Sequence, residues 1–240
     1  MVALGLSGPM VAAAQDALGS SALVLGGNAT QPDTVPKAIA AAVRTFGRFD
    51  ALYHVAGGSG RAWGDGSLHD VTDEAWRATL DLNLTSVFLS NRAAVRQFLS
   101  QKTGGAILNV GSVLASSPSS RHFSTHAYAT AKAGIEGLSR AVAARYASDG
   151  IRINVIAAGL VETPMSQRAA ADERIMRFIH TKQPLDGGRI GHPDDLDGAA
   201  VYFLSDASRF VTGQVLTIDG GWSVTDGADS PAAESRPASP

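Results

Sequence analysis

The sequence predicts an α/β fold: a doubly wound parallel sheet with helices on both faces. Short apolar runs typical of strands alternate with longer segments of helical periodicity along most of the 240 residues. Polar or glycine-rich residues follow the expected strands, at Gly5, Gly27-Asn28, Ala56-Gly57, Ser112 and 159–163. Because parallel strands place their carboxyl ends at one edge of a sheet, these residues are expected to converge on one ligand site.

In the first half of the chain, three expected strands are each followed by a helix. The strands span 2–6, 22–25 and 51–55. The helices span 10–17, 36–46 and 72–95 or beyond. Ser7 and Thr72 are suitable N-caps because a hydroxyl can accept a hydrogen bond from a free backbone N–H, and Gly47 is suited to end the second helix.

The second half continues the alternation, with strands expected at 106–110, 151–157 and 215–218 and helices at 127–147 and 194–204. A charged helical excursion is expected over 165–192. After Gly227 only Ala, Ser, Pro, Asp and Glu occur, apart from Arg236, a composition unable to bury a core. We therefore expect one domain over 1–226 and a disordered tail over 227–240.

The composition argues against several classes of protein. A net charge of -2 gives no sign of a nucleic-acid or membrane surface, and no apolar run reaches the length of a membrane span. The chain has no cysteine, and its six histidines lack metal-ligand spacing, so no metal site is expected. The first basic residue is Lys37, so the charged start of a signal peptide is missing and a cytoplasmic location is expected.

Ser112, Tyr128 and Lys132 form a candidate catalytic group. Tyr128 and Lys132 are four residues apart and share one helix face, while Ser112 follows a strand. A lysine ammonium close to a tyrosine favours the phenolate and lowers its pKa from about 10. With a serine hydroxyl holding the substrate oxygen, the pair can move a proton during hydride transfer. An isolated Tyr-x-x-x-Lys is far more typical of a solvated helix surface, so further motifs are needed to favour the catalytic interpretation.

Several motifs in the same order resemble the short-chain dehydrogenase/reductase family from near residue 1 to about Trp222. They are LDLNLTSVF, ILNVGS, AYATAK, IRINVIAAGLVETPM, GRIGHPDDLDGAAVYFLSDAS and VTGQVLTIDGGW. The resemblance implies a Rossmann-like fold and an NAD(P)-dependent oxidoreductase that interconverts an alcohol and a ketone.

The resemblance also implies roles for individual residues. Tyr128 would be the acid/base, Lys132 would lower its pKa and hold the nicotinamide ribose, and Ser112 would position the substrate oxygen. Asn83 would hold a water in the proton relay. The cofactor would further contact Asn28, Ala29, Ala56, Gly57, Val161 and Thr163.

The sequence departs from the family at its start. The glycine-rich TGxxxGxG turn and its strand and helix, about 30 residues in a βαβ unit, are absent. The family's sheet order 3-2-1-4-5-6-7 would place that strand between 2–6 and 51–55, so we expect residues 1–50 to dock poorly. Where the family has an acidic residue after its second strand, this chain has Gly5. His54 and Val55 replace the two asparagines of the family's NNAG turn.

Three interpretations follow from the missing unit. The chain is an oxidoreductase whose true start lies upstream, or a truncated non-catalytic member that serves as an oligomer partner or regulator, or a catalytic short form with a rebuilt cofactor site. All four tetrad residues are present, which favours the first and third interpretations.

The substrate side of the site is expected to consist of three segments, 59–70, 114–126 and 165–192. Their side chains suggest a mid-sized, partly apolar alcohol or ketone. The resemblance implies a homodimer or homotetramer built through the helices over 72–100 and 127–147. The cofactor is NAD or NADP, with a slight preference for NAD because no arginine is present at Gly5 to bind a 2′-phosphate.

Overall fold

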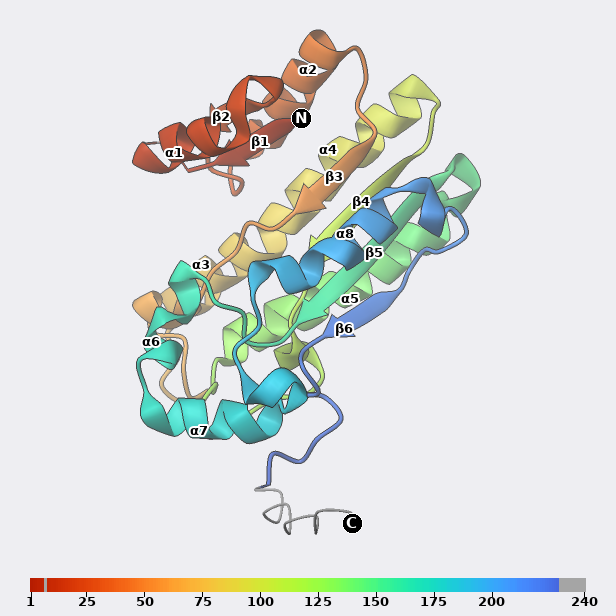
Figure 1. Cartoon of the computed structure of the whole chain (residues 1–240). Helices are drawn as coiled ribbons and strands as arrows, with labels where there is room; N and C mark the ends of the chain where they lie inside the picture. Colours follow the sequence, from red (N-terminus) through yellow and green to blue (C-terminus); the bar gives the residue numbers. More distant parts are fainter. Residues whose placement is uncertain (7, 229–240) are drawn as a thin grey trace, which may run out of the picture.

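The computed structural model describes residues 1–6 and 8–228, so the cap expected at Ser7 and the tail over 229–240 lie outside the described residues. Strands and helices alternate as expected (Figure 1). Their order is β1 (Val2–Gly5), α1 (Pro9–Leu18), β2 (Leu23–Gly26), α2 (Thr34–Phe46), β3 (Ala51–His54), α3 (Asp73–Leu80), α4 (Ser86–Gln101), β4 (Gly105–Val110), α5 (His126–Tyr146), β5 (Ile151–Ala158), α6 (Gln167–Ala170), α7 (Glu173–Lys182), α8 (Asp197–Leu204) and β6 (Val215–Ile218). The parallel α/β fold is confirmed.

The strands form two parallel sheets. β3, β4, β5 and β6 pair in that order, whereas β1 pairs with β2. Within the described part of the chain, no strand lies between β1 and β3, and these two strands share no ladder. This is the place where the family order puts one more strand.

Helix packing joins the N-terminal unit to the rest of the molecule. Val35 and Ile39 of α2 are buried in one hydrophobic cluster with Phe98 of α4 and Ile107 of β4. α2 ends at Gly47, whose φ of 79° is favourable for glycine. The β1–β2 unit is therefore held by side-chain packing on α4 and not by backbone hydrogen bonds to β3.

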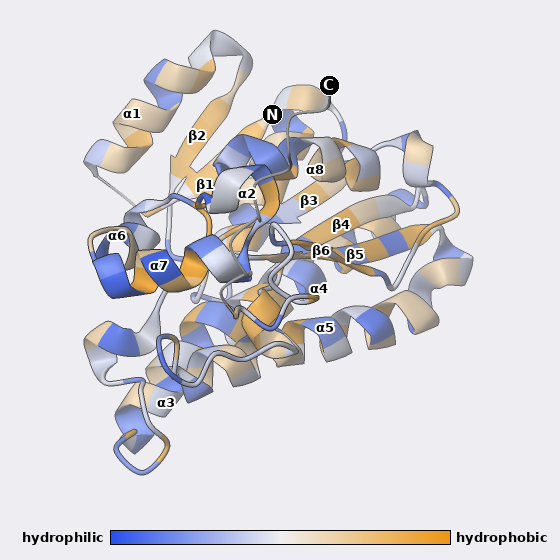
Figure 2. Cartoon of the chain, turned by 60° about the horizontal axis from the view of Figure 1, so that its bottom comes forward, coloured by the Kyte–Doolittle hydropathy of each residue, from blue (hydrophilic) through white to orange (hydrophobic). Residues whose placement is uncertain are grey.

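The core lies on the two central strands, β4 and β5. Helices α4 and α5 cover one face of the four-stranded sheet and α8 covers the other (Figure 1). Hydrophobic residues gather on the strands and on the inner sides of the helices (Figure 2). Strands covered on both faces are mostly apolar. The fully buried residues of β4 and β5 include Ile107, Leu108, Ile153, Val155 and Ile156, together with the polar side chains of Asn109 and Asn154.

The helix expected over 72–95 is interrupted. Thr72 caps α3 as expected, accepting a hydrogen bond from the N–H of Ala75 at 3.1 Å. A π-helical turn, Asp81–Thr85, then separates α3 from α4. Such turns insert an extra residue into a helix and often lie at functional sites. None of the helices in the described ranges has the length and apolarity needed to cross a membrane.

The split sheet predicts uneven protection of backbone amides. β1 and β2 are bonded only to each other, whereas β4 is paired on both sides, so the amides of 2–5 and 23–26 should exchange before those of 105–110. Hydrogen exchange followed by mass spectrometry measures this directly. Equal protection of the two groups of strands, together with resistance of residues 1–50 to proteolysis, would show that helix packing alone makes the sheets one cooperative unit.

Candidate active site

Asn83 lies in the π-helical turn and is fully buried. Its amide oxygen accepts a hydrogen bond from the N–H of Gly58 at 3.0 Å, and its amide nitrogen donates to the carbonyl of Gly58 at 2.9 Å and to that of Thr79 at 2.9 Å. The side chain therefore binds the loop after β3 through both of its polar atoms. This bond fixes the loop against the helix at the carboxyl edge of the sheet.

Ser112 and Tyr128 meet at the same edge. Ser112 follows β4, and its hydroxyl accepts a hydrogen bond from the N–H of Leu114 at 3.2 Å. Tyr128 lies in the first turn of α5. Burial raises the pKa of the Tyr128 hydroxyl to about 12, although contact with the Ser112 hydroxyl lowers it. In this structure the tyrosine is therefore protonated at neutral pH.

Lys132 lies one helical turn after Tyr128 and is buried. Its ammonium donates a hydrogen bond to the carbonyl of Val110 at 2.8 Å and lies 5.5 Å from the centre of the Tyr128 ring. Burial lowers the pKa of Lys132 to about 8. In the chain alone, loss of solvent dominates at both groups and the ammonium is directed at the Val110 carbonyl, so the lowering of the Tyr128 pKa by Lys132 stays a prediction.

Asp65 positions the helix that carries Tyr128 and Lys132, a role that the sequence did not reveal. Its buried carboxylate accepts hydrogen bonds from the N–H groups of Ala127 and Tyr128, each at 3.0 Å. These N–H groups belong to the first turn of α5, where no intrahelical partner exists. No local signal could have identified this bond, because the two partners are more than 60 residues apart.

His54, which stands where the family has an asparagine, supports the loop after β3. Its Nδ1 lies 2.9 Å from the Ser90 hydroxyl, and its Nε2 lies 3.1 Å from the carbonyl of Ala56. Burial, and then the charge of Lys132, lower the pKa of His54 to about 4. A neutral imidazole therefore bridges β3 and α4 beneath the site.

The residues expected to hold the cofactor fall into three places. Ala56 and Gly57 are exposed after β3, beside Asn83 and Lys132. Gly57 has no room for a side chain, since a Cβ there would lie 2.9 Å from the Asn83 amide oxygen and 3.6 Å from the Lys132 nitrogen. Val161 follows β5 and forms a β-bridge with Gly191.

Thr163 lies in the same loop, where its N–H donates to the Ser166 hydroxyl at 2.9 Å. The start of this loop is held by Gln183, a buried residue that the sequence did not single out, whose amide oxygen accepts from the N–H of Leu160 at 2.6 Å. Asn28 and Ala29 belong to the separate β1–β2 unit. The Asn28 amide oxygen accepts hydrogen bonds from the N–H and hydroxyl of Thr30, at 3.0 and 2.9 Å, so it is engaged in a local turn.

Comparison with known proteins places this arrangement in a family. A family model described as enoyl-(acyl carrier protein) reductase matches residues 4–223. The cis-4-hydroxycyclohexanecarboxylate dehydrogenase of Sinomonas cyclohexanicum is 34% identical over 204 residues, which is 85% of this chain and 78% of that protein.

Solved structures of similar proteins have the same fold. A short-chain type dehydrogenase/reductase from Mycobacterium ulcerans is 28% identical with a TM-score of 0.83, over 93% of this chain and 80% of that one. A gluconate 5-dehydrogenase from Burkholderia cenocepacia J2315, in complex with NADP and tartrate, is 26% identical with a TM-score of 0.80, over 92% and 84% of the two chains.

These matches define the class of protein as a nicotinamide-dependent oxidoreductase with a Rossmann-like fold. The chain belongs to the short-chain dehydrogenase/reductase family. The resemblance seen in the sequence motifs is therefore confirmed, as is the enzyme class that it implied.

Removing the Asp65 carboxylate should destabilise the fold. Asp65→Ala leaves two N–H groups of α5 without their acceptor, which costs about 1–3 kcal/mol for unpaired buried groups. Urea unfolding of this variant and of Asp70→Ala measures the difference, since the side chain of Asp70 is 70% exposed. Equal stability of the two variants would contradict the role assigned to Asp65.

His54 should make stability depend on pH. Its folded pKa of about 4 is below its ordinary value of 6.5, so between these values the unfolded chain binds a proton that the folded chain does not. The stability present above pH 6.5 is therefore lost as the pH falls toward 4. His54→Asn should lose less stability than the wild type between pH 7 and pH 5 in denaturant titrations.

His69→Asn is the matched control for this measurement, because the side chain of His69 is 83% exposed. It should keep the pH dependence of the wild type. The same loss of stability in wild type and His54→Asn would show that another group is responsible.

Proposed function

We propose that the chain interconverts a small alcohol and its ketone, with Tyr128 as the proton carrier. The carboxyl edge of one sheet brings together Asn83, Ser112, Tyr128 and Lys132, and this convergence is the observation that carries the proposal. The nicotinamide cofactor, when bound, supplies or accepts the hydride. In reduction, the Tyr128 hydroxyl donates its proton to the carbonyl oxygen, and in oxidation the Tyr128 phenolate accepts the alcohol proton.

The other three residues assist this transfer. The Ser112 hydroxyl donates a hydrogen bond to the substrate oxygen and fixes it beside Tyr128. The Lys132 ammonium stabilises the phenolate that forms and holds the nicotinamide ribose. Its pKa of about 8 leaves it mainly protonated at pH 7, as both tasks require. Asn83 orders a water that returns the proton to solvent.

The residues present fit the nicotinamide half of a dinucleotide. The backbone of Ala56 and Gly57 is exposed, and the absence of a Cβ at Gly57 keeps the space beside Asn83 and Lys132 open. Val161 and Thr163 lie at the end of the neighbouring β5. Asn28 and Ala29 would hold the adenine half. We retain the slight preference for NAD, because the end of β1 carries Gly5 and no arginine.

The same proposal covers assembly and location. The substrate is a small molecule, and neither nucleic acid nor a membrane is a partner. The chain acts in the cytoplasm as a homodimer or homotetramer that packs through α4 and α5. Phe88 and Leu99 on α4 are 42% and 41% exposed, which supports this choice of surface.

A second candidate function is a non-catalytic partner or regulator of related chains. The observation that favours it is the missing ladder between β1 and β3, beside which no glycine-rich phosphate turn stands within the described residues. Titration of the purified chain with NADH and NADPH, followed by nicotinamide fluorescence, separates the candidates. Micromolar binding supports the enzyme, whereas no binding up to millimolar concentration supports the partner.

Replacing the Tyr128 hydroxyl should abolish turnover without unfolding the protein. Tyr128→Phe removes the proton carrier, and general acid–base catalysis contributes about 10²- to 10⁴-fold to rate. Absorbance of NADH and NADPH at 340 nm, with a panel of secondary alcohols and ketones, measures the loss. Tyr146→Phe on the same helix is the control and should keep wild-type turnover. Equal activity of both variants would assign the proton transfer to another group.

A further inference from the structure

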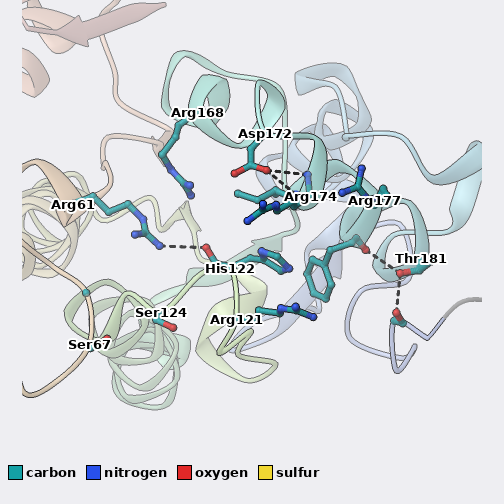
Figure 3. A pocket seen from close by; sticks show the side chains of 14 residues that line it. Arg61, Ser67, Arg121, His122, Ser124, Arg168, Asp172, Arg174, Arg177 and Thr181 are labelled. Atoms are coloured by element: carbon teal, nitrogen blue, oxygen red, sulfur yellow. Dashed lines mark hydrogen bonds between the residues drawn. The ribbon is translucent and has the colours of Figure 1, made fainter.

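A large, strongly cationic pocket lies beside the candidate active site. Its volume is about 1000 Å³, and it is bounded by the loop at 61–67, the loop at 121–124 and the helices α6 and α7 (Figure 3). Five arginines line it, against a single acidic residue, Asp172. They are Arg61, Arg121, Arg168, Arg174 and Arg177. The whole chain, by contrast, carries 20 basic and 22 acidic residues.

Within the part of the chain that the structure describes, Arg177 pairs with Glu173 at 3.7 Å, whereas the other four arginines of the pocket form no ion pair. Among the described residues, no carboxylate lies within 4.0 Å of the guanidinium groups of Arg61, Arg121, Arg168 or Arg174. The Asp172 carboxylate is engaged in capping α7, where it accepts hydrogen bonds from two backbone N–H groups at 2.8 and 3.3 Å. The pocket therefore holds several guanidinium groups that are free to bind an anion.

Arg61 and Arg168 face the same space from different segments, Arg61 from the loop after β3 and Arg168 from α6 (Figure 3). Loss of solvent lowers the pKa of the Arg61 guanidinium, and the Arg168 charge lowers it further. Arg61 also donates a hydrogen bond to the carbonyl of His122 at 3.3 Å, which fixes its direction. The Asp65 carboxylate raises this pKa in part, and an anion between Arg61 and Arg168 would be attracted to both guanidinium groups.

The wall of the pocket contacts the helix that carries Tyr128 and Lys132. The carbonyl oxygen of Gly66 in its wall lies 2.6 Å from Nδ1 of His126, and His126 begins the helix that carries Tyr128. The residue before Gly66 is Asp65, which binds the N–H of Tyr128. None of the four tetrad side chains lines the pocket, so it suits a part of the substrate remote from the reacting carbon.

The helices that carry the arginines are docked on the catalytic loop. Ile175 and Ile179 of α7 are buried in one cluster with Trp222 and with Val113, the residue after Ser112. The His122 ring packs on Phe178 with their centres 4.9 Å apart, which adds an apolar wall. The pocket therefore combines a surface for a carbon skeleton with cations for a charged end.

We propose that this pocket binds an anionic group, a carboxylate or a phosphate, carried by the substrate, so that the enzyme acts on a hydroxy acid or a phosphorylated alcohol. This proposal rests on the proposed oxidoreductase function. Planar guanidinium groups bind both carboxylate and phosphate in a bidentate manner, so the chemistry fits either anion.

Direct binding tests the proposal without turnover. D-glucitol, D-gluconate and D-glucitol 6-phosphate share a six-carbon polyol chain and differ in one charged group. Isothermal titration calorimetry with the full chain should show that at least one of the two anions binds about tenfold or more tightly than D-glucitol, as expected for a charge-assisted contact. The anion that binds more tightly identifies the group. Equal affinity for all three ligands would overturn the proposal.

Substitutions assign the binding to the pocket. Arg61→Gln and Arg168→Gln should each weaken the preferred anion about tenfold, whereas Arg140→Gln, an exposed position on α5 paired with Glu136 at 3.4 Å, removes the same charge and should not. Unchanged anion affinity in both pocket variants would overturn the proposal. Normal anion binding by the wild-type chain, with no turnover of either anion, would instead count against the proposed function alone.

Discussion

At the carboxyl edge of the sheet, buried side chains supply many of the hydrogen bonds that the backbone requires where strand pairing ends. Buried N–H and carbonyl groups are costly to leave unpaired, so these backbone groups need a partner. Four residues do this here, each at a loop, a strand end or a helix start next to a candidate functional group. They are Asn83 on Gly58, Asp65 on the first turn of α5, Lys132 on Val110 and Gln183 on Leu160. The geometry of the site therefore depends on these bonds.

Two of these residues belong to the tetrad, so their catalytic and structural roles cannot be separated by deletion. Lys132 carries a charge for Tyr128 and also satisfies the carbonyl of Val110. Asn83 is expected to hold a water and also binds both backbone groups of Gly58. Within the described residues, the Tyr128 hydroxyl makes no hydrogen bond to the backbone, so its loss disturbs the structure less than the loss of either of these side chains.

Local signals predicted most elements, because caps and apolar periodicity act within a few residues. Thr72 and Gly47 bound their helices as expected. The π-helical turn at Asp81–Thr85 was not predicted, since one inserted residue barely alters an apolar pattern. The role of Asp65 and the pKa of Tyr128 depend on contacts and burial that only the folded chain creates. The pocket arginines lie on the three segments expected to form the substrate side of the site, but that five of their side chains line one pocket required the structure.

The candidate cofactor site is divided between the two sheets, and this division links cofactor affinity to packing far from the chemistry. The nicotinamide half belongs to the four-stranded sheet, whereas Asn28 and Ala29 follow β2 in the other sheet. The two units meet through α2 and α4, where Val35 and Ile39 are buried. A dinucleotide that contacts both units binds only when they are docked, and it must therefore stabilise that docking by the same free energy. On the proposed contacts, the packing of α2 on α4 would therefore set how much of the cofactor's intrinsic affinity is realised.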